Sequence, residues 1–580
     1  MTVRLKDLSL GHLGTRHYFI LIAILLLGLG LRFWNLDAKP LWLDEVLTAL
    51  FTMGKSYQDV PLEQFFPLTE LDQLFAVRSS VTCPQLTQTL IIESVHPPLF
   101  FCLLQSWLGW LKPNAENWVW LLRSLPALFG VGLIAAIYWL NRVAFSPAAG
   151  LLGAALMAVS PFAVYLSQEA RHYTLPMLLI TLGLTALLKI QQAPRRFTPW
   201  LWIAWTAVNI IGLYVHYFCL LALIAQIGTI AAWMIYQRQQ IIRRQWMGLS
   251  LSIITIAASF LPWLPIFISH MTRPETDWLI PYKPDWTDRI APLYQTLVGW
   301  VLMVIALPIE DQPDSIAIPF AVLGLVFALW LSWQLYHHFR RFWRNTQNHP
   351  PTLLLFGFIA CVLLQFFAVV YILDKDLTVV PRYNFVYYPA VCALLGACLT
   401  EQGNREARES LSPIPVTLLI VGFLSSLLVI HNFAFHKSYR PDRVAQDMAF
   451  EPDKSVAVVV SYRSPQEVAL GLSFALALRQ QYAPDIVDSR VRFAFVDRTE
   501  GYNRVWRQLP QLSQPLPMPL NLWVVASPGM RTKDYPDRLR LRNPATPNQR
   551  SICPVDPEEL HRIGFPYQLF RCQERSRTRS

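Results

Sequence analysis

The chain has 580 residues, of which 54% are hydrophobic and only 15% carry a charge. This composition, with 21 tryptophans, is typical of a protein that crosses a membrane many times and excludes a soluble domain of this length. The net charge of +11 does not indicate nucleic-acid binding, because the basic residues lie in short loops between apolar runs. We therefore expect membrane lipids, and no nucleic acid, among the partners.

The first apolar segment, residues 18–33, follows basic residues and has no small-residue cleavage site after it. We interpret it as an uncleaved first span with a cytoplasmic N-terminus. The chain then reaches residues 41–45, Leu-Trp-Leu-Asp-Glu, which set two adjacent carboxylates at the expected membrane surface. Taken alone, Asp44 and Glu45 are also explained as acids at the start of a short helix, where the helix dipole favours them.

Basic loops determine the expected topology, because loops rich in arginine and lysine stay in the cytoplasm. Satisfying all of these loops leaves about eleven crossings, each near the length that a bilayer requires. The cytoplasmic loops are expected at 189–196, 237–244, 337–344 and 405–409. The expected spans are 18–33, 118–140, 147–164, 174–190, 199–214, 217–235, 247–269, 316–336, 351–373, 383–400 and 412–432.

Two further apolar stretches, 97–111 and 290–307, do not fit as crossings, because either one would invert every later loop. Both are flanked by proline or tryptophan, which is common in segments that lie at a membrane surface. We assign both as interfacial or re-entrant helices on the extracytoplasmic face. The alternative is that both cross the membrane, and it violates the charge rule at the loops between them.

The composition changes after the last predicted span. Strand-like runs at 455–460, 491–496 and 520–525, with a helical pattern at 466–480, predict a small α/β domain outside the membrane. No nucleotide-binding fingerprint accompanies these strands. The alternatives left open for this region are that it presents the acceptor, binds a partner or covers a site.

The expected fold is therefore a polytopic α-helical membrane protein of about eleven transmembrane helices, with interfacial helices in its outer loops and a small extracytoplasmic α/β domain at its C-terminus. Residues 1–436 form the predicted membrane domain, in which 34–117 is the first outer loop, and residues 437–580 form the predicted C-terminal domain. We expect the protein in the plasma (inner) membrane.

Eight cysteines occur in the chain. Cys553 and Cys572 lie in the polar tail, where they are able to pair if the tail faces an oxidising compartment, and the sequence leaves this pairing open. Five others, Cys102 among them, lie in apolar segments and are interpreted as small buried residues.

The predicted topology collects a set of polar and aromatic residues in the outer loops, although the charge rule used none of them. Each has an ordinary explanation by itself: a helix start for His96, snorkelling for Arg123 and an interfacial belt for His216. Together these explanations require acids, histidines and arginines to gather on one face by accident. The set consists of Asp44, Glu45, His96, Arg123, Glu169, Arg171, Tyr173, His216, Arg382 and Tyr383.

One reaction explains this set, namely transfer of a sugar from a lipid phosphate. The transfer needs a carboxylate that deprotonates the acceptor, for which Asp44 and Glu45 are candidates, and cations that stabilise the departing phosphate, for which the three arginines are candidates. Glu169 and the two histidines are candidates to assist by hydrogen bonding. A divalent cation bound by Asp44, Glu45, His96 and His216 stays an open alternative, because their spacing carries no metal signature.

Six short motifs follow one another along the chain, at 41–45, 96–100, 123–130, 160–162, 168–173 and 381–383. In this order they resemble the membrane-embedded C superfamily of glycosyltransferases, and more closely its protein O-mannosyltransferase and aminoarabinose-transferase-like branch. The resemblance covers about residues 17–432. It implies a polyprenyl-phosphate-linked monosaccharide donor, inverting transfer on the extracytoplasmic side, Asp44 as the base with Glu45 as its neighbour, and Arg123 and Arg382 at the donor phosphate.

Two features depart from the family pattern. The insert 61–89, which contains Cys83, is longer than expected, and the α/β tail has no counterpart in the pattern. These departures leave the acceptor open between a protein, a glycolipid and a wall polymer. Two other functions also stay open at this point: a polymerase or ligase of surface glycans with a lipid-linked oligosaccharide donor, and a lipid or solute transporter.

Overall fold

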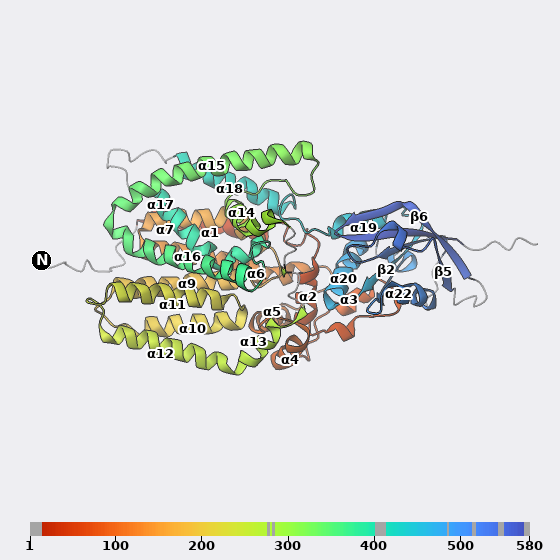
Figure 1. Ribbon diagram of the computed structural model, residues 1–580, viewed down its shortest axis with the longest axis horizontal. Coiled ribbons are helices and arrows are strands. Elements are labelled where there is room, and N and C mark those ends of the chain that lie inside the picture. The colour runs from red at the N-terminus through yellow and green to blue at the C-terminus, as the bar shows by residue number, and fades with distance from the viewer. Residues whose placement is uncertain are drawn as a thin grey trace, which may run out of the picture. The chain divides into compact units, whose positions relative to one another are not determined.

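The computed structural model describes residues 14–274, 279–280, 285–400, 413–483, 486–512, 518–542 and 550–573, so the predicted loop 405–409 lies outside the described residues (Figure 1). The chain forms two compact units. The first, called the membrane unit below, contains Met1–Leu36, Val95–Phe100 and Arg123–Phe435. The second, called the sheet unit, contains Asp37–Ser94, Phe101–Leu122 and His436–Ser580. Most of the first outer loop thus belongs to the same unit as the C-terminal residues.

The membrane unit is built of helices. Among the described residues, eight helical segments are long and apolar enough to cross a membrane, or nine if the bent pair α7–α8 is one span. Every predicted span falls on one helix or on consecutive helical segments, although α10 and α17 are shorter than a full crossing. The polytopic helical fold is confirmed, and the number eleven stays a prediction. The helices are α1 (Thr15–Phe33), α6 (Trp118–Ala144), α7 (Pro147–Val159), α8 (Pro161–Ser167), α9 (Thr174–Gln192), α10 (Pro199–Val215), α11 (Cys219–Tyr236), α12 (Arg243–Phe260), α13 (Leu264–Met271), α14 (Trp286–Leu302), α15 (Asp314–Arg344), α16 (His349–Ile372), α17 (Tyr388–Leu399) and α18 (Pro413–Ile430).

One predicted span, 147–164, is sharply bent in the structure. Helices α7 and α8 meet at 60° at Ser160, whose backbone is extended and whose neighbour Pro161 has no N–H to continue the helical hydrogen bonds. The carbonyls at the end of α7 therefore need other donors. The buried guanidinium of Arg32 supplies them, at 3.0 Å from the carbonyl of Met157 and 3.1 Å from that of Ala158.

The basic loops lie together at one end of the membrane unit. The Gln191 amide donates to the Pro350 carbonyl, which places the C-terminal end of α9 beside the start of α16. Gln245, at the start of α12, donates to the carbonyls of Ala193 and Arg196. Helices α9 to α12 lie side by side (Figure 1) and reverse direction at each turn, so the basic loops share one end and the connections before α9 and α11 lie at the other.

The sheet unit contains a seven-stranded sheet in the order β1-β3-β2-β4-β7-β6-β5. Strands β3, β2 and β4 are parallel, as expected of the α/β pattern, and the others pair antiparallel. The three predicted strands and the predicted helix are confirmed. The strands are β1 (Phe65–Phe66), β2 (Ser455–Tyr462), β3 (Val491–Asp497), β4 (Leu520–Val525), β5 (Arg538–Arg542), β6 (Arg550–Ile563) and β7 (Phe565–Cys572). The helices are α2 (Leu43–Thr52), α3 (Glu70–Leu74), α4 (Cys83–Glu93), α5 (Leu99–Leu111), α19 (Pro441–Met448), α20 (Pro465–Arg479), α21 (Val487–Arg490) and α22 (Tyr502–Gln508).

Helix α20 lies between the sheet and the first outer loop. Its residues Val468–Ala475 are all buried, so it is apolar on every side, as expected of a helix that is covered all round. It packs against β2, against α19 and against α2 of the first outer loop. The apolar tail helix therefore needs the first outer loop as part of its cover.

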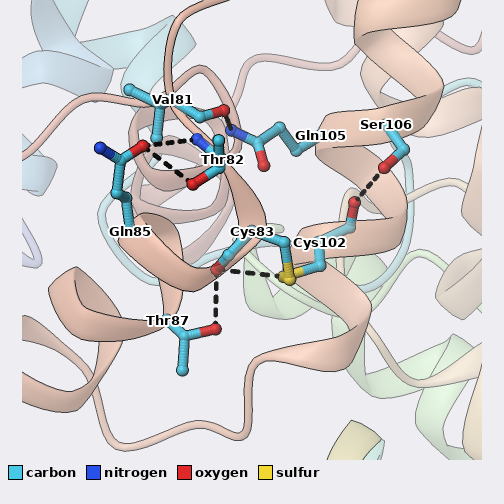
Figure 2. Close-up of a disulfide and its surroundings, with 8 residues drawn as sticks. All are labelled: Val81, Thr82, Cys83, Gln85, Thr87, Cys102, Gln105 and Ser106. Carbon is cyan, nitrogen blue, oxygen red and sulfur yellow. Dashed lines mark hydrogen bonds between the residues drawn. A yellow bond between two sulfur atoms is a disulfide. The ribbon is translucent and has the colours of Figure 1, made fainter.

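Two disulfides occur in the sheet unit. Cys553 pairs with Cys572, which settles the pairing that the sequence left open. Cys102 was expected to be an ordinary buried residue, and this is wrong: it is bonded to Cys83, which begins α4 (Figure 2). Gln105 also donates to the Val81 carbonyl, so the insert is fastened to α5 at two points (Figure 2).

Candidate functional site

The two acids of the first outer loop lie on the first turn of α2, in the sheet unit. Asp44 is half-buried and Glu45 is 1% exposed. The residue that caps this helix is Trp42, whose side chain makes no capping hydrogen bond. The Leu43 N–H instead donates to the Tyr439 hydroxyl at 2.7 Å. The first turn of α2 is thus completed by a residue from the other end of the sequence.

Three histidines form a cluster in the membrane unit. His96 precedes α5, His172 lies between α8 and α9, and His216 lies between α10 and α11. The ring centroids of His96 and His172 are 4.8 Å apart, and those of His172 and His216 are 4.4 Å apart. All three lie outside the spans, at the end of the unit opposite the basic loops. We call them the histidine cluster.

The histidine cluster is neutral but lies among cations. Burial lowers the pKa of all three imidazoles well below the usual range, and the positive charge of Arg171 lowers each further. The charge of Arg382 also lowers the pKa of His96 and His172. Because burial disfavours more charge on the imidazoles, the positive charge of the cluster comes from its arginines.

The hydrogen bonds fix the tautomers of two histidines. The Nη2 of Arg171 lies 3.1 Å from Nε2 of His96, and since an arginine only donates, this Nε2 accepts and His96 carries its proton on Nδ1. The Phe218 N–H donates to Nδ1 of His216 at 3.0 Å, so His216 carries its proton on Nε2. The Nε2–H of His216 is therefore a donor on the side of the ring opposite the Phe218 N–H.

Aromatic rings surround the histidine cluster. The Phe385 ring lies 4.9 Å from His216 and 5.5 Å from Tyr173, and the Phe218 ring lies 4.8 Å from Tyr383. The Arg171 and Arg382 guanidiniums lie over the rings of Tyr173 and Tyr383, at 6.0 Å and 5.8 Å from the centroids. These contacts help to orient both guanidiniums, a group whose planar shape suits an oxyanion.

Two other predicted residues lie on neighbouring elements. Glu169 is buried in the turn that leads to the cluster, where its carbonyl accepts from the Arg171 N–H at 2.7 Å. Arg123 is buried on α6 and donates to the Leu36 carbonyl at 2.9 Å. The Thr174 hydroxyl donates to the Pro126 carbonyl, which holds this part of α6 against the start of α9.

The structure thus brings six of the ten predicted residues into one cluster, and the function of the set stays a prediction. It also adds residues that the sequence reasoning left out. His172 lies between the predicted residues Arg171 and Tyr173, and Phe218 follows His216 by two positions, so their place in the motifs could have indicated them. Nothing in the sequence indicated Phe385. The six are His96, Arg171, Tyr173, His216, Arg382 and Tyr383.

A metal ion was an open alternative for Asp44, Glu45, His96 and His216. Within the described ranges, no group of three or more His, Cys, Asp or Glu side chains is arranged to hold one. The histidine cluster contains no carboxylate ligand and has a guanidinium in contact with His96, which opposes a cation there.

No protein-family model matches the chain, and neither does any curated protein. Among solved structures it is similar to ArnT from Cupriavidus metallidurans bound to undecaprenyl phosphate, with 12% identity, 89% of this chain and 94% of that chain covered, and a TM-score of 0.48. The apo state of the same protein gives 12% identity, 89% and 93% coverage and a TM-score of 0.49. The archaeal oligosaccharyltransferase AglB from Archaeoglobus fulgidus, in complex with an inhibitory peptide and a dolichol-phosphate, gives 12% identity, 81% and 65% coverage and a TM-score of 0.42.

Proposed function

We propose that the protein is a membrane glycosyltransferase that moves a monosaccharide from a polyprenyl-phosphate-linked donor to an acceptor on the extracytoplasmic side, with inversion at the sugar. One observation carries this proposal. Arg171 and Arg382 lie among the three neutral histidines of the cluster. The cluster is at the end of the membrane unit that is opposite the basic loops. Such a cationic site beside apolar spans suits a phosphate that is attached to a lipid.

The arginines are proposed to bind the donor phosphate. A guanidinium offers two parallel N–H groups to phosphate oxygens, and it keeps its charge when buried. As the bond between the sugar and the phosphate breaks, negative charge grows on the leaving oxygen, and fixed cations then stabilise the transition state more than the ground state. The Nε2–H of His216 is a neutral donor for the same phosphate.

Asp44 is proposed as the base. It is half-buried, whereas Glu45 on the same turn is buried, so Asp44 is the better placed carboxylate to meet an acceptor hydroxyl. In the reaction, Asp44 takes the proton of the acceptor hydroxyl, the acceptor oxygen bonds to the anomeric carbon from the face opposite the phosphate, and the polyprenyl phosphate departs with the electron pair.

Charge and disulfides support the orientation that this reaction needs. The basic loops share one end of the membrane unit, which the positive-inside rule assigns to the cytoplasm together with the N-terminus. The sheet unit contains two disulfides, which form in extracytoplasmic compartments. We therefore propose an inner-membrane protein whose sheet unit and histidine cluster face the extracytoplasmic side. A protein or a glycolipid of that side is the proposed acceptor.

Mass spectrometry of lipid-linked and protein-linked glycans tests this function in cells that carry the wild-type gene, no gene, or the Asp44→Asn variant. We expect a sugar modification that is present only with the wild type and a matching accumulation of the lipid-linked monosaccharide in the other two. Unchanged lipid and acceptor pools after gene removal would refute the transferase.

A further inference from the structure

We propose that the C-terminal part of the chain is a positioning element for the acidic motif, acting through Lys437, Tyr439 and Ser473. This inference rests on the proposed function, because it concerns the placement of Asp44. It assigns the α/β tail a role in the transfer itself: the tail holds the three residues that precede the two acids. All contacts that support it lie within the sheet unit.

The first contact completes a helix. The first N–H groups of a helix generally lack partners within it, and a Ser, Thr, Asp or Asn normally stands before the first turn to accept from the second or third of them. Here that position is Trp42, which has no side-chain acceptor. The Tyr439 hydroxyl accepts from the Leu43 N–H, the first N–H of the helix, so a tail residue binds one of the N–H groups of this turn.

Two more contacts hold the neighbouring residues. The Ser473 hydroxyl, on α20, donates to the Leu41 carbonyl at 2.5 Å. The Lys437 ammonium lies 3.9 Å from the centroid of the Trp42 ring, a cation–π distance. Leu41, Trp42 and Leu43 are thus each held by a different tail residue, through a carbonyl, a ring and an N–H. This fixes both the direction and the rotation of the turn that carries Asp44.

The tail residues are themselves held in place. Tyr439 is buried, and its ring lies 6.2 Å from that of Phe474 on α20. At the β6–β7 turn, Gly564 has φ +71°, and a Cβ added there would come within 2.8 Å of the Tyr439 Cβ and 2.9 Å of its Cα. The turn therefore packs directly on the backbone of Tyr439, and only glycine fits.

Later residues of the first outer loop also contact the tail. Strand β1 pairs with β3 of the tail. Further along, the Thr69 hydroxyl donates to the Asp488 carboxylate at 2.5 Å. The guanidinium of Arg479 then donates to both carboxylate oxygens of Asp72, at 2.5 Å and 2.9 Å. The first outer loop therefore contacts the tail both before residue 61, at residues 41–43, and after it, at β1, Thr69 and Asp72. These contacts leave α2 little freedom to move relative to α20.

Tyr439→Phe tests the inference, because it removes one hydroxyl and keeps the ring. The matched control is Tyr482→Phe, which removes the hydroxyl of another buried tyrosine of the sheet unit, one that has no hydrogen-bond partner in the described part of the chain. In the full-length purified protein, hydrogen–deuterium exchange of the first turn of α2 is expected to rise about two- to tenfold in Tyr439→Phe and to stay unchanged in Tyr482→Phe.

Two further readouts separate positioning from simple loss of structure. Product in cells, measured by glycan mass spectrometry, is expected to fall by about tenfold or more in Tyr439→Phe, because small displacements of a reacting group are costly. Binding of undecaprenyl phosphate to the purified variant, used as the donor-lipid probe, is expected to equal that of the wild type. Lys437→Arg, which keeps the cation, is expected to retain product that Lys437→Met loses.

The outcomes are distinguishable. Unchanged exchange in Tyr439→Phe would overturn the contact, and unchanged product in Tyr439→Phe with loss of product in Asp44→Asn would overturn the positioning role alone. Unchanged product in both variants would refute the assigned base and, with it, the inference. A fall in undecaprenyl phosphate binding as large as the fall in product would also overturn it, since the role would then be structural.

Discussion

The two units hold their candidate site residues in place by different means. In the membrane unit, the connections between helices bring the histidine cluster and its arginines together, and burial keeps the imidazoles neutral. In the sheet unit, Asp44 lies on a short helix. The Leu43 N–H in the first turn of this helix donates to the hydroxyl of Tyr439, which is 396 residues later in the chain. The first arrangement follows from topology, whereas the second depends on a few long-range contacts. Variants of the two regions should therefore fail in different ways.

The largest effect is expected at the proposed base. Asp44→Asn removes the proton acceptor with little change in size, and a general base contributes about a hundredfold to ten-thousandfold to a rate. We expect transfer to fall by this factor while undecaprenyl phosphate still binds. The measurement is the rate of product formation in membranes, with Asp37→Asn, an exposed acid earlier in the same loop, as the control. Equal loss in both variants would remove the special role of Asp44.

Loss of the Cys83–Cys102 disulfide is expected to weaken the sheet unit. The bond closes a loop with a sequence separation of 19, and closing a loop of this length typically contributes about 2–4 kcal/mol to the free energy of unfolding. The double variant Cys83→Ser/Cys102→Ser should unfold at lower denaturant concentration. Cys361→Ser, at a free and partly exposed cysteine, should not. Equal midpoints in the wild type and double variant would contradict a stabilising role.

The histidine cluster predicts a dependence of stability on pH. The pKa of each imidazole is lower in the folded protein than the value of about 6.5 in the unfolded chain, so below this pH the unfolded chain binds protons that the folded protein does not. The free energy of unfolding should be level above about pH 7.5 and fall below about pH 6.5, by up to about 1.4 kcal/mol per pH unit for each histidine.

Thermal unfolding between about pH 5.5 and 7.5 measures this dependence. His216→Gln should show a shallower slope than the wild type, because one of the three imidazoles of the histidine cluster is gone. His337→Gln, at an exposed histidine on α15, should keep the wild-type slope. A variant slope as steep as that of the wild type would show that the histidine cluster does not titrate in this way.

Local patterns predicted much of this molecule. The apolar runs located the helices, and alternating strand and helix located β2, β3, β4 and α20. Strand β6 was missed because it contains Pro554 and Pro557, and its pairing with β7 is interrupted between Val555 and Leu560. Prolines and bulges remove the alternation by which a strand is recognised.

The candidate site divides in the same way. The charge rule placed His96, Arg171 and His216 on one side, and they lie together in the structure because connections at one end of a helix bundle are neighbours. Other contacts join distant parts of the chain, and nothing in the local sequence of either part predicts them. They are the Cys83–Cys102 bond, the pairing of strand β1 and the contact of Leu43 with Tyr439. Contacts of this kind are set by packing, which local periodicity does not encode.

Binding of undecaprenyl phosphate to the purified full-length protein tests most directly the claim that the arginines of the histidine cluster hold a lipid phosphate. Arg382→Ala should weaken binding about tenfold or more, since a charge-assisted contact is lost. Arg340→Ala, at an exposed arginine on α15, should bind as the wild type does. Equal affinity of Arg382→Ala and the wild type would contradict the account.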